Sequence, residues 1–200
     1  MTKLLAIIFL ALVLFGLWWW FFKDDSRPGA PKVEALKVSH HTTIFNQSIS
    51  NAVSSYLDIK AALVESDSPK VQSMGTKFIT MLDSIRLDEL KKDTTVILTT
   101  AQAQIGDIKT NTMAMLKEPN LTEMRQDFRM VTENFYPFLK TIHYEGPKLY
   151  LQNCPMAFGE GRDANWISNT EEIINPYLGK NNPEFKATML HCGSIVDTIK

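Results

Sequence analysis

The sequence has almost no excess of charge of either sign and very few cysteines. Its 200 residues carry 21 basic and 22 acidic side chains, a formal net charge of -1, and only two cysteines. A nearly neutral chain argues against global binding of polyanions such as nucleic acids. Two cysteines are also far fewer than the paired C-x-x-C motifs that are typical of zinc modules.

The motifs of several common enzymes are also missing. The sequence contains no G-x-S-x-G, P-loop, H-E-x-x-H or G-x-G-x-x-G pattern. These patterns mark many hydrolases, nucleotide-binding proteins and zinc proteases. A thiol nucleophile at Cys154, with His143 or His191 as its base, would lack an orienting third group at a recognisable spacing. We therefore expect a protein that is not an enzyme and binds no nucleotide.

One long apolar run, residues 4–22, contains no charged side chain. As a helix, these 19 residues would be roughly 28 Å long, close to the hydrocarbon thickness of a bilayer. The run ends in Trp18–Phe22, whereas the region before a signal-peptide cleavage site ends in small residues. Residues 1–22 are therefore expected to be an uncleaved signal anchor, a transmembrane helix. Secretion after cleavage is the alternative.

The charges that flank the apolar run predict its orientation. Lys3 precedes it and Lys23-Asp24-Asp25 follows it, so the positive-inside bias keeps the N-terminus in the cytoplasm. The rest of the chain would then be periplasmic, held at the inner membrane by a single pass. Residues 23–37, in which charge, proline and glycine are concentrated, are expected to be a tether.

Residues 38–145 repeat a helical spacing of apolar side chains and are expected to form an up-down four-helix bundle. The expected helices run from about Phe45 to Asp67, from Ser68 to Ile85, from Asp88 to Leu116, and from Asn120 to Ile142. Ser68-Pro69 reads as an N-cap followed by proline at the first helical position, and Asn120 with Glu123 resembles a capping box. Pro137 should kink the last helix or end it one turn early.

The C-terminal segment, residues 146–200, has short apolar pieces separated by turns. Lys148–Gln152 alternates as a strand does, and Ala187–His191 is its expected partner in a short β-hairpin. The rest is expected to be loop. The predicted fold is therefore mainly α: an N-terminal transmembrane helix, a four-helix bundle and a small irregular C-terminal segment.

Potential metal ligands stand at the two ends of this segment. If its two apolar pieces pair, two thiols, two thioethers and an imidazole converge on one site: Cys154, Met156, Met189, His191 and Cys192. Soft sulfur ligands select Cu(I) or another thiophilic ion such as Ag(I). His143 is a further candidate ligand, and Trp166 a candidate shield against water and oxidants.

The competing interpretation is structural. Two cysteines in an exported domain most simply form a Cys154–Cys192 disulfide, with the methionines as core residues. The two interpretations are compatible, because oxidation of the pair would switch a metal site off.

The same segment resembles the domain family of unknown function DUF3347. The resemblance rests on Cys154–Ala157, Asn165-Trp166, Glu172–Tyr177 with Gly179, and Met189-Leu190 with Cys192-Gly193. Tyr56–Asp67 and Arg125–Lys140 also look like the family's first and last helices, so the resemblance covers roughly residues 45–199. That family occurs in exported proteins and fused to periplasmic adaptor subunits of heavy-metal efflux systems. The resemblance thus implies copper or silver handling outside the cytoplasm.

This chain departs from the family pattern at two places. Residues 180–188 look like an insertion, and the third helix lacks the histidine that many members carry there. If that histidine is a ligand in relatives, the site here is built differently.

Two functional predictions follow. The first is a membrane-anchored periplasmic module that binds Cu(I) or Ag(I) for storage, sensing or efflux, with a heavy-metal efflux complex as a candidate partner. The alternative is an envelope protein-interaction domain with a structural Cys154–Cys192 disulfide and no metal.

Overall fold

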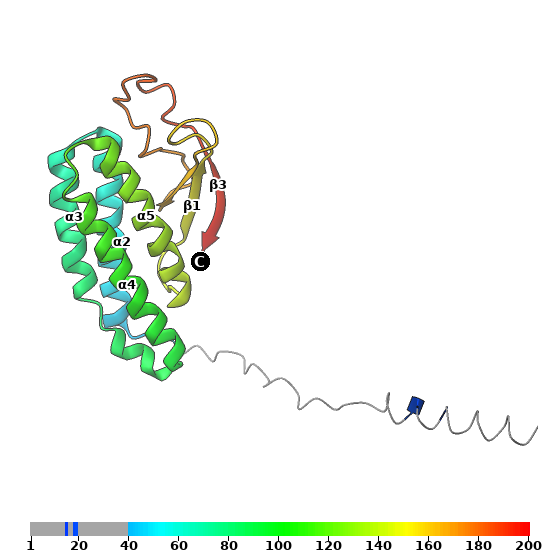
Figure 1. Ribbon diagram of the computed structural model, residues 1–200. Coiled ribbons are helices and arrows are strands. Elements are labelled where there is room, and N and C mark those ends of the chain that lie inside the picture. Colours follow the sequence, from blue (N-terminus) through cyan, green and yellow to red (C-terminus); the bar gives the residue numbers. More distant parts are fainter. Residues whose placement is uncertain (1–14, 16–17, 20–39) are drawn as a thin grey trace, which may run out of the picture. The chain divides into compact units, whose positions relative to one another are not determined.

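The computed structural model describes residues 15, 18–19 and 40–200 (Figure 1). Chain contacts divide the protein into residues 1–35 and 36–200, and the fold below is that of the second unit. The predicted anchor and tether therefore lie outside the described residues, except for Phe15, Trp18 and Trp19. Within the described ranges, no helix is long and apolar enough to cross a membrane.

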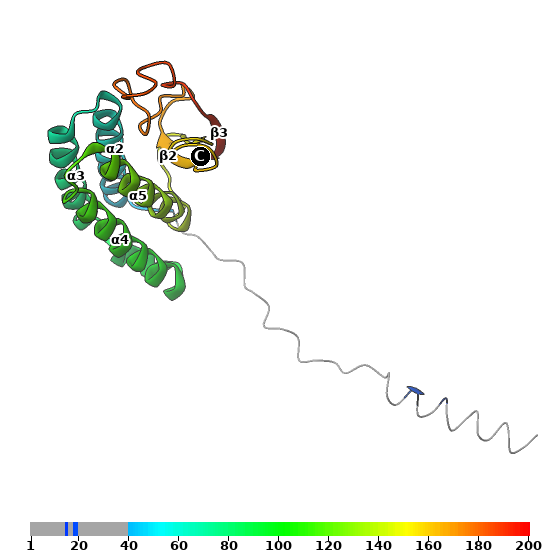
Figure 2. The ribbon, with the colours of Figure 1, turned by 45° about the horizontal axis from the view of Figure 1, so that its top comes forward.

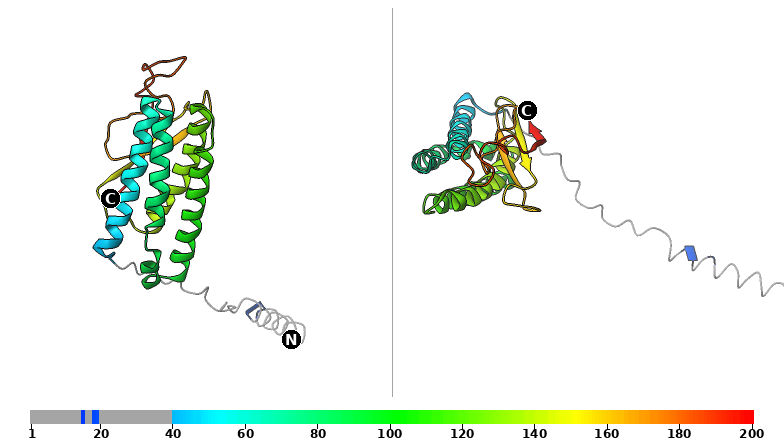
Figure 3. Two further views of the ribbon diagram at one scale, coloured as in Figure 1. Left: turned by 90° about the vertical axis from the view of Figure 1, so that its left-hand side faces the viewer. Right: turned by 90° about the horizontal axis from the view of Figure 1, so that it is seen from above.

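Residues 40–200 contain the four predicted α-helices, which confirms a mainly α fold. They are α2 (Thr43–Glu65), α3 (Ser68–Asp83), α4 (Thr95–Met115) and α5 (Leu121–Thr141). Figure 3 shows them side by side along their lengths. The Asn120 side chain caps α5 by accepting a hydrogen bond from the Glu123 amide, as expected. The N-cap of α3, however, is Asp67 rather than Ser68, with Pro69 in the first turn.

Two boundaries differ from the sequence prediction. The third helix starts at Thr95 rather than Asp88, because the hydroxyl of Thr94 caps a new helix by accepting from the Ile97 amide. Residues Leu87–Lys92 before it form a separate 3-10 helix, η1. The last helix continues past Pro137 to Thr141 and so does not end one turn early.

The bundle core is built around aromatic rings that the helical spacing places inward. Tyr56 of α2 stacks on Phe128 of α5 with ring centroids 5.0 Å apart, and it also contacts Phe78 and Phe135. All four rings are fully buried. Such pairs stabilise a core beyond the apolar area that they bury.

The C-terminal segment contains a three-stranded antiparallel sheet in place of the expected hairpin. Its strands are β1 (Leu149–Cys154), β2 (Ala164–Ser168) and β3 (Ser194–Ile199), in the order β2-β1-β3. The sheet lies beside the bundle, with β2 against α5 and α2 (Figure 2). The amide of Ile167 in β2 donates to the buried Tyr56 hydroxyl, so a side chain of the bundle core satisfies a strand backbone group.

The prediction that Ala187–His191 pairs with β1 is wrong. That stretch forms consecutive turns, with the amides of Thr188, Leu190 and Cys192 each bonded to the carbonyl three residues earlier. The strand beside β1 on that side is β3, in which only Ile199 is buried. An exposed strand carries no buried apolar alternation for a sequence pattern to detect.

Candidate thiol site

Two cysteines that lie far apart in the sequence meet at one end of the sheet. Cys154 is the last residue of β1, and Cys192 lies just before β3. Because Asn153 of β1 pairs with Ser194 of β3, the two strands lie side by side here, and the Sγ atoms of the two cysteines are 2.6 Å apart. Both are free thiols; Cys154 is buried and Cys192 partly exposed. Burial, followed by the neighbouring Cys154 thiol, raises the pKa of Cys192.

The buried side chain of Asn175 holds the backbone around Cys192. Its amide nitrogen Nδ2 donates to the Cys192 carbonyl at 3.0 Å, while its Oδ1 accepts from the amides of Tyr177 and Leu178. The backbone amide of Asn175 also donates to the Leu190 carbonyl at 2.8 Å. A single asparagine therefore ties the turn before β3 to the loop after β2.

Gly193 permits the close approach of the strands next to Cys192. Its φ of 141° is one that residues with side chains rarely adopt. A Cβ atom there would lie 2.6 Å from the Asn153 carbonyl oxygen and 2.9 Å from the ring of Trp166. The position beside the thiol thus requires glycine.

Trp166 of β2 packs behind this position and is fully buried. Its indole nitrogen donates to Oε1 of Gln152 at 2.7 Å, and its ring contacts that of Tyr177 edge to face. The Trp166 ring reaches Gly193, the neighbour of Cys192. Shielding of the thiols by Trp166 stays a prediction, and this position is compatible with it.

The remaining predicted ligands are placed less uniformly. Met156 lies two residues after Cys154, and 40% of its surface is exposed. Met189 is partly buried, and its backbone carbonyl accepts a hydrogen bond from the Cys192 amide. His191 is exposed, and its Nδ1 lies 2.8 Å from the Ile173 carbonyl oxygen. Across residues 40–200 and the other described positions, no group of three or more His, Cys, Asp or Glu side chains is arranged to hold a metal ion. His191 is therefore not gathered with the two thiols.

His143 lies at the opposite end of the sheet from the thiols. It follows α5 and lines a groove with Thr198, Ile199 and Lys200. Ile199 pairs with Leu149, the first residue of β1, whereas Cys154 is the last. Five residues of strand separate these ends by roughly 17 Å, so the structure does not bring His143 to the cysteines.

The helical part of the chain identifies its family. Residues 52–145 match the family described as "Protein of unknown function (DUF3347)". The chain contains a DUF3347 domain. No curated protein and no solved structure matches the chain. The match extends from α2 to the end of the bundle, so the two cysteines lie outside the matched residues, although the sequence resemblance extended to about residue 199.

The geometry of the thiol pair next to the DUF3347 bundle bears on what it can bind. Thiolates with thioethers nearby are donors that suit a soft monovalent ion. At 2.6 Å, however, the Sγ atoms are too close for both to bind one ion through bonds of about 2.3 Å in an open geometry. They would have to move apart to hold a metal, whereas a disulfide needs them slightly closer, at about 2.05 Å.

Two buried cations join the DUF3347 bundle to the C-terminal segment, and sequence reasoning missed both. Lys60 of α2, 9% exposed, donates from Nζ to the buried hydroxyl of Ser168 in β2 at 3.0 Å. Burial lowers the pKa of Lys60 to about 8, and the charge of Glu172 opposes this shift. The signal was present in the sequence, because Lys60 stands four residues after Tyr56 on the buried helix face.

Arg125 of α5 is the second buried cation. Its Nε donates to the Pro176 carbonyl at 2.9 Å, and its Nη2 donates to the Leu63 carbonyl at 3.0 Å. Burial lowers the pKa of Arg125 to about 10. The Leu63 carbonyl belongs to the last turn of α2, where the helix dipole favours a positive charge. Arg125 thus links two helices and the loop that leads to the thiol site.

Proposed function

We propose that this chain is a membrane-anchored periplasmic protein whose reduced Cys154–Cys192 pair binds Cu(I) or Ag(I). The anchor is the apolar run of residues 4–22, which a charged and proline-containing tether joins to the domain. Its role would be to store, sense or deliver the ion, with a heavy-metal efflux complex as the partner. No catalysis is involved.

The observation that carries the proposal is the meeting of two thiols at the end of the sheet. Cys154 and Cys192 are 38 residues apart in the sequence, yet their sulfur atoms touch. Met156 and Met189 lie in the two chain segments that present these thiols, within a few residues of them. Thioether donors favour soft ions such as Cu(I) over Zn²⁺, and neither kind of sulfur donor suits Mg²⁺.

The second candidate is an envelope interaction domain in which Cys154 and Cys192 form a structural disulfide. The 2.6 Å contact between the Sγ atoms specifically favours it. In an oxidising compartment such a pair tends to become oxidised, and closing the loop would stabilise the fold by roughly 4 kcal/mol in the chain-entropy account. An oxidised pair cannot ligate a metal, so the redox state decides between the two functions.

The test is a Cu(I) titration of the full-length chain in detergent, after reduction, against a competing Cu(I) chelator. We expect the wild-type chain to withdraw copper from the chelator and C154S/C192S to lose this ability. Met156→Ala and Met189→Ala should weaken it less. The matched control is Met130→Ala, because Met130 is about as exposed as Met156 but lies on α5. Absence of tight binding, or its retention in C154S/C192S, would refute the metal proposal.

A thiol count separates the two candidates in the cell envelope. Protein extracted without reductant is alkylated in denaturant, so that the buried Cys154 can react, and mass spectrometry then reports whether Cys154 and Cys192 carry the label. Labelled thiols support the metal proposal. Thiols that react in denaturant only after reduction support the structural disulfide.

A further inference from the structure

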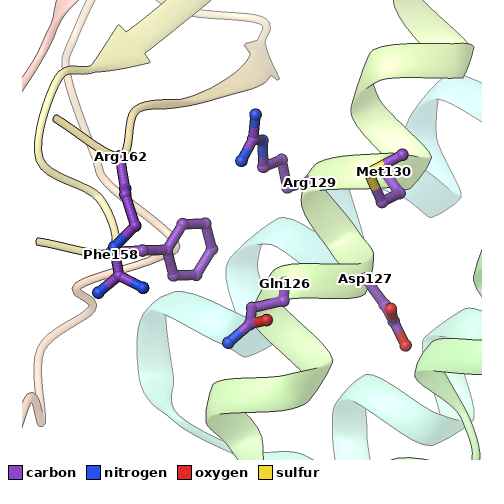
Figure 4. Close-up of a pocket in the computed structure, with 6 residues that line it drawn as sticks. All are labelled: Gln126, Asp127, Arg129, Met130, Phe158 and Arg162. Carbon is purple, nitrogen blue, oxygen red and sulfur yellow. The ribbon is translucent and has the colours of Figure 1, made fainter.

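A groove lies between α5 and the loop that follows β1, close to the thiol site but lined by other residues. Its volume is about 290 Å³, and its walls include Gln126 and Arg129 from α5 and Phe158 and Arg162 from the loop. A smaller hollow of about 180 Å³ shares three of these side chains and extends the groove to Tyr177. Figure 4 shows Gln126, Arg129 and the Phe158 ring pointing into the gap between helix and loop.

Local hydrogen bonds fix the loop wall. The Phe158 amide donates to the Arg162 carbonyl, and the Arg162 amide donates to the Gly159 carbonyl, both at 3.1 Å. The Phe158 ring packs edge to face on Tyr177, with centroids 5.3 Å apart. Tyr177 is itself buried. The aromatic face of the groove is therefore held in place before any ligand arrives.

The guanidinium groups of Arg129 and Arg162 keep hydrogen-bond donors for which the described residues provide no acceptor. Arg129 bonds Glu133 through Nε at 2.7 Å, and this ion pair engages one edge of its guanidinium. Arg162 is exposed, and no residue within 40–200 forms a hydrogen bond or ion pair with its guanidinium. Two cations from different elements thus line one groove, and a guanidinium group is a favourable partner for a carboxylate.

Three carboxylates lie near these arginines: Asp127, Glu133 and Asp163. Asp127 also lines the groove, but its side chain points away from Phe158 and Arg162 in Figure 4. The carboxylate of Asp163 accepts from the Asn153 side chain at 2.9 Å, on the side of the sheet. Among the lining residues, two arginines stand against one carboxylate, so the net formal charge of the lining is positive.

We propose that this groove binds a small organic carboxylate with an apolar or aromatic body. The carboxylate would bind the guanidinium groups of Arg129 and Arg162, and the apolar body would pack on the Phe158 ring. Gln126 adds a neutral hydrogen-bonding group. The volume suits a molecule of about ten non-hydrogen atoms, below the usual range of drug-sized pockets.

Phenylacetate is a suitable probe, with phenylacetamide as its uncharged control. Binding of each is measured by isothermal titration calorimetry to the full-length chain in detergent. We expect phenylacetate to bind and phenylacetamide to bind at least about tenfold more weakly, since a charge-assisted hydrogen bond contributes roughly this factor. Arg162→Gln and Arg129→Gln should each weaken phenylacetate binding by about the same factor. Arg86→Gln is the matched control, because Arg86 is an exposed arginine outside the groove, just before η1.

Three results would overturn the proposal: no phenylacetate binding at tens of millimolar, equal binding of acid and amide, or unchanged binding in Arg162→Gln. Circular dichroism of each variant shows whether its fold is retained. C154S/C192S should still bind phenylacetate, so this inference can fail or succeed independently of the metal proposal.

Discussion

Lys60 should make the stability of this protein rise with pH in the alkaline range. The pKa of Lys60 is about 8 in the folded protein, against 10.5 for an ordinary lysine. Between these values the unfolded chain binds more protons than the folded one, so the free energy of unfolding increases as pH rises. A difference of 2.5 pKa units corresponds to about 3 kcal/mol. The contribution is complete above the unfolded pKa and is lost as pH falls through 8.

The measurement compares the urea denaturation of the wild-type chain with that of Lys60→Met under reducing conditions. Far-ultraviolet circular dichroism monitors the unfolding. The difference in free energy of unfolding between the two should change by about 2 kcal/mol between pH 7.5 and 10, in favour of the wild type. Taking the difference removes the titration of Cys192 and of the buried tyrosines, whose pKa values are raised in both proteins.

The exposed Lys77, paired with Asp58 on the surface, provides the control. Lys77→Met should show no comparable change with pH, because its ammonium group stays in contact with water. A flat difference between wild type and Lys60→Met over this range would show that Lys60 remains fully charged in the folded protein. The reasoning from burial would then be wrong.

Three further substitutions test the packing around the site by the same denaturation assay. Arg125→Met should lower the free energy of unfolding by about 3 kcal/mol, because the buried carbonyls of Leu63 and Pro176 lose the charged group that donates hydrogen bonds to them. Tyr56→Phe should lower it by about 1 to 2 kcal/mol, because the Ile167 amide loses its acceptor. Gly193→Ala should lower it by about 2 kcal/mol or more through backbone strain and the close Asn153 carbonyl, and a change below about 0.5 kcal/mol would contradict so close an approach of the two backbones.

The helices could be predicted because their buried residues recur at helical spacing. Phe45, Ile49, Tyr56 and Leu63 lie on one face of α2, and all are buried as the pattern required. The division between η1 and α4 was not predicted, because the apolar pattern continues across it. Only the hydroxyl of Thr94 marks the new helix start.

The C-terminal segment was harder to predict because long-range contacts decide its structure. In β3, Ile195 and Val196 are exposed, so the strand has no inward apolar face to recognise. The sequence predicted that Cys154 and Cys192 converge, but through pairing of β1 with Ala187–His191. In the structure, β1 pairs instead with β3, which follows Cys192. His143 was misplaced as a candidate ligand, because the sequence does not reveal the direction of β1 relative to α5.

The buried bonds of Lys60 and Arg125 bear on how the protein can be divided experimentally. A fragment that ended at residue 145, the limit of the family match, would remove Ser168 and the Pro176 carbonyl, which these cations bind. Each cation would then lack a partner on the face that the sheet had covered. We expect such a fragment to lose cooperative unfolding, and a shorter expression fragment therefore needs to retain the chain through β3.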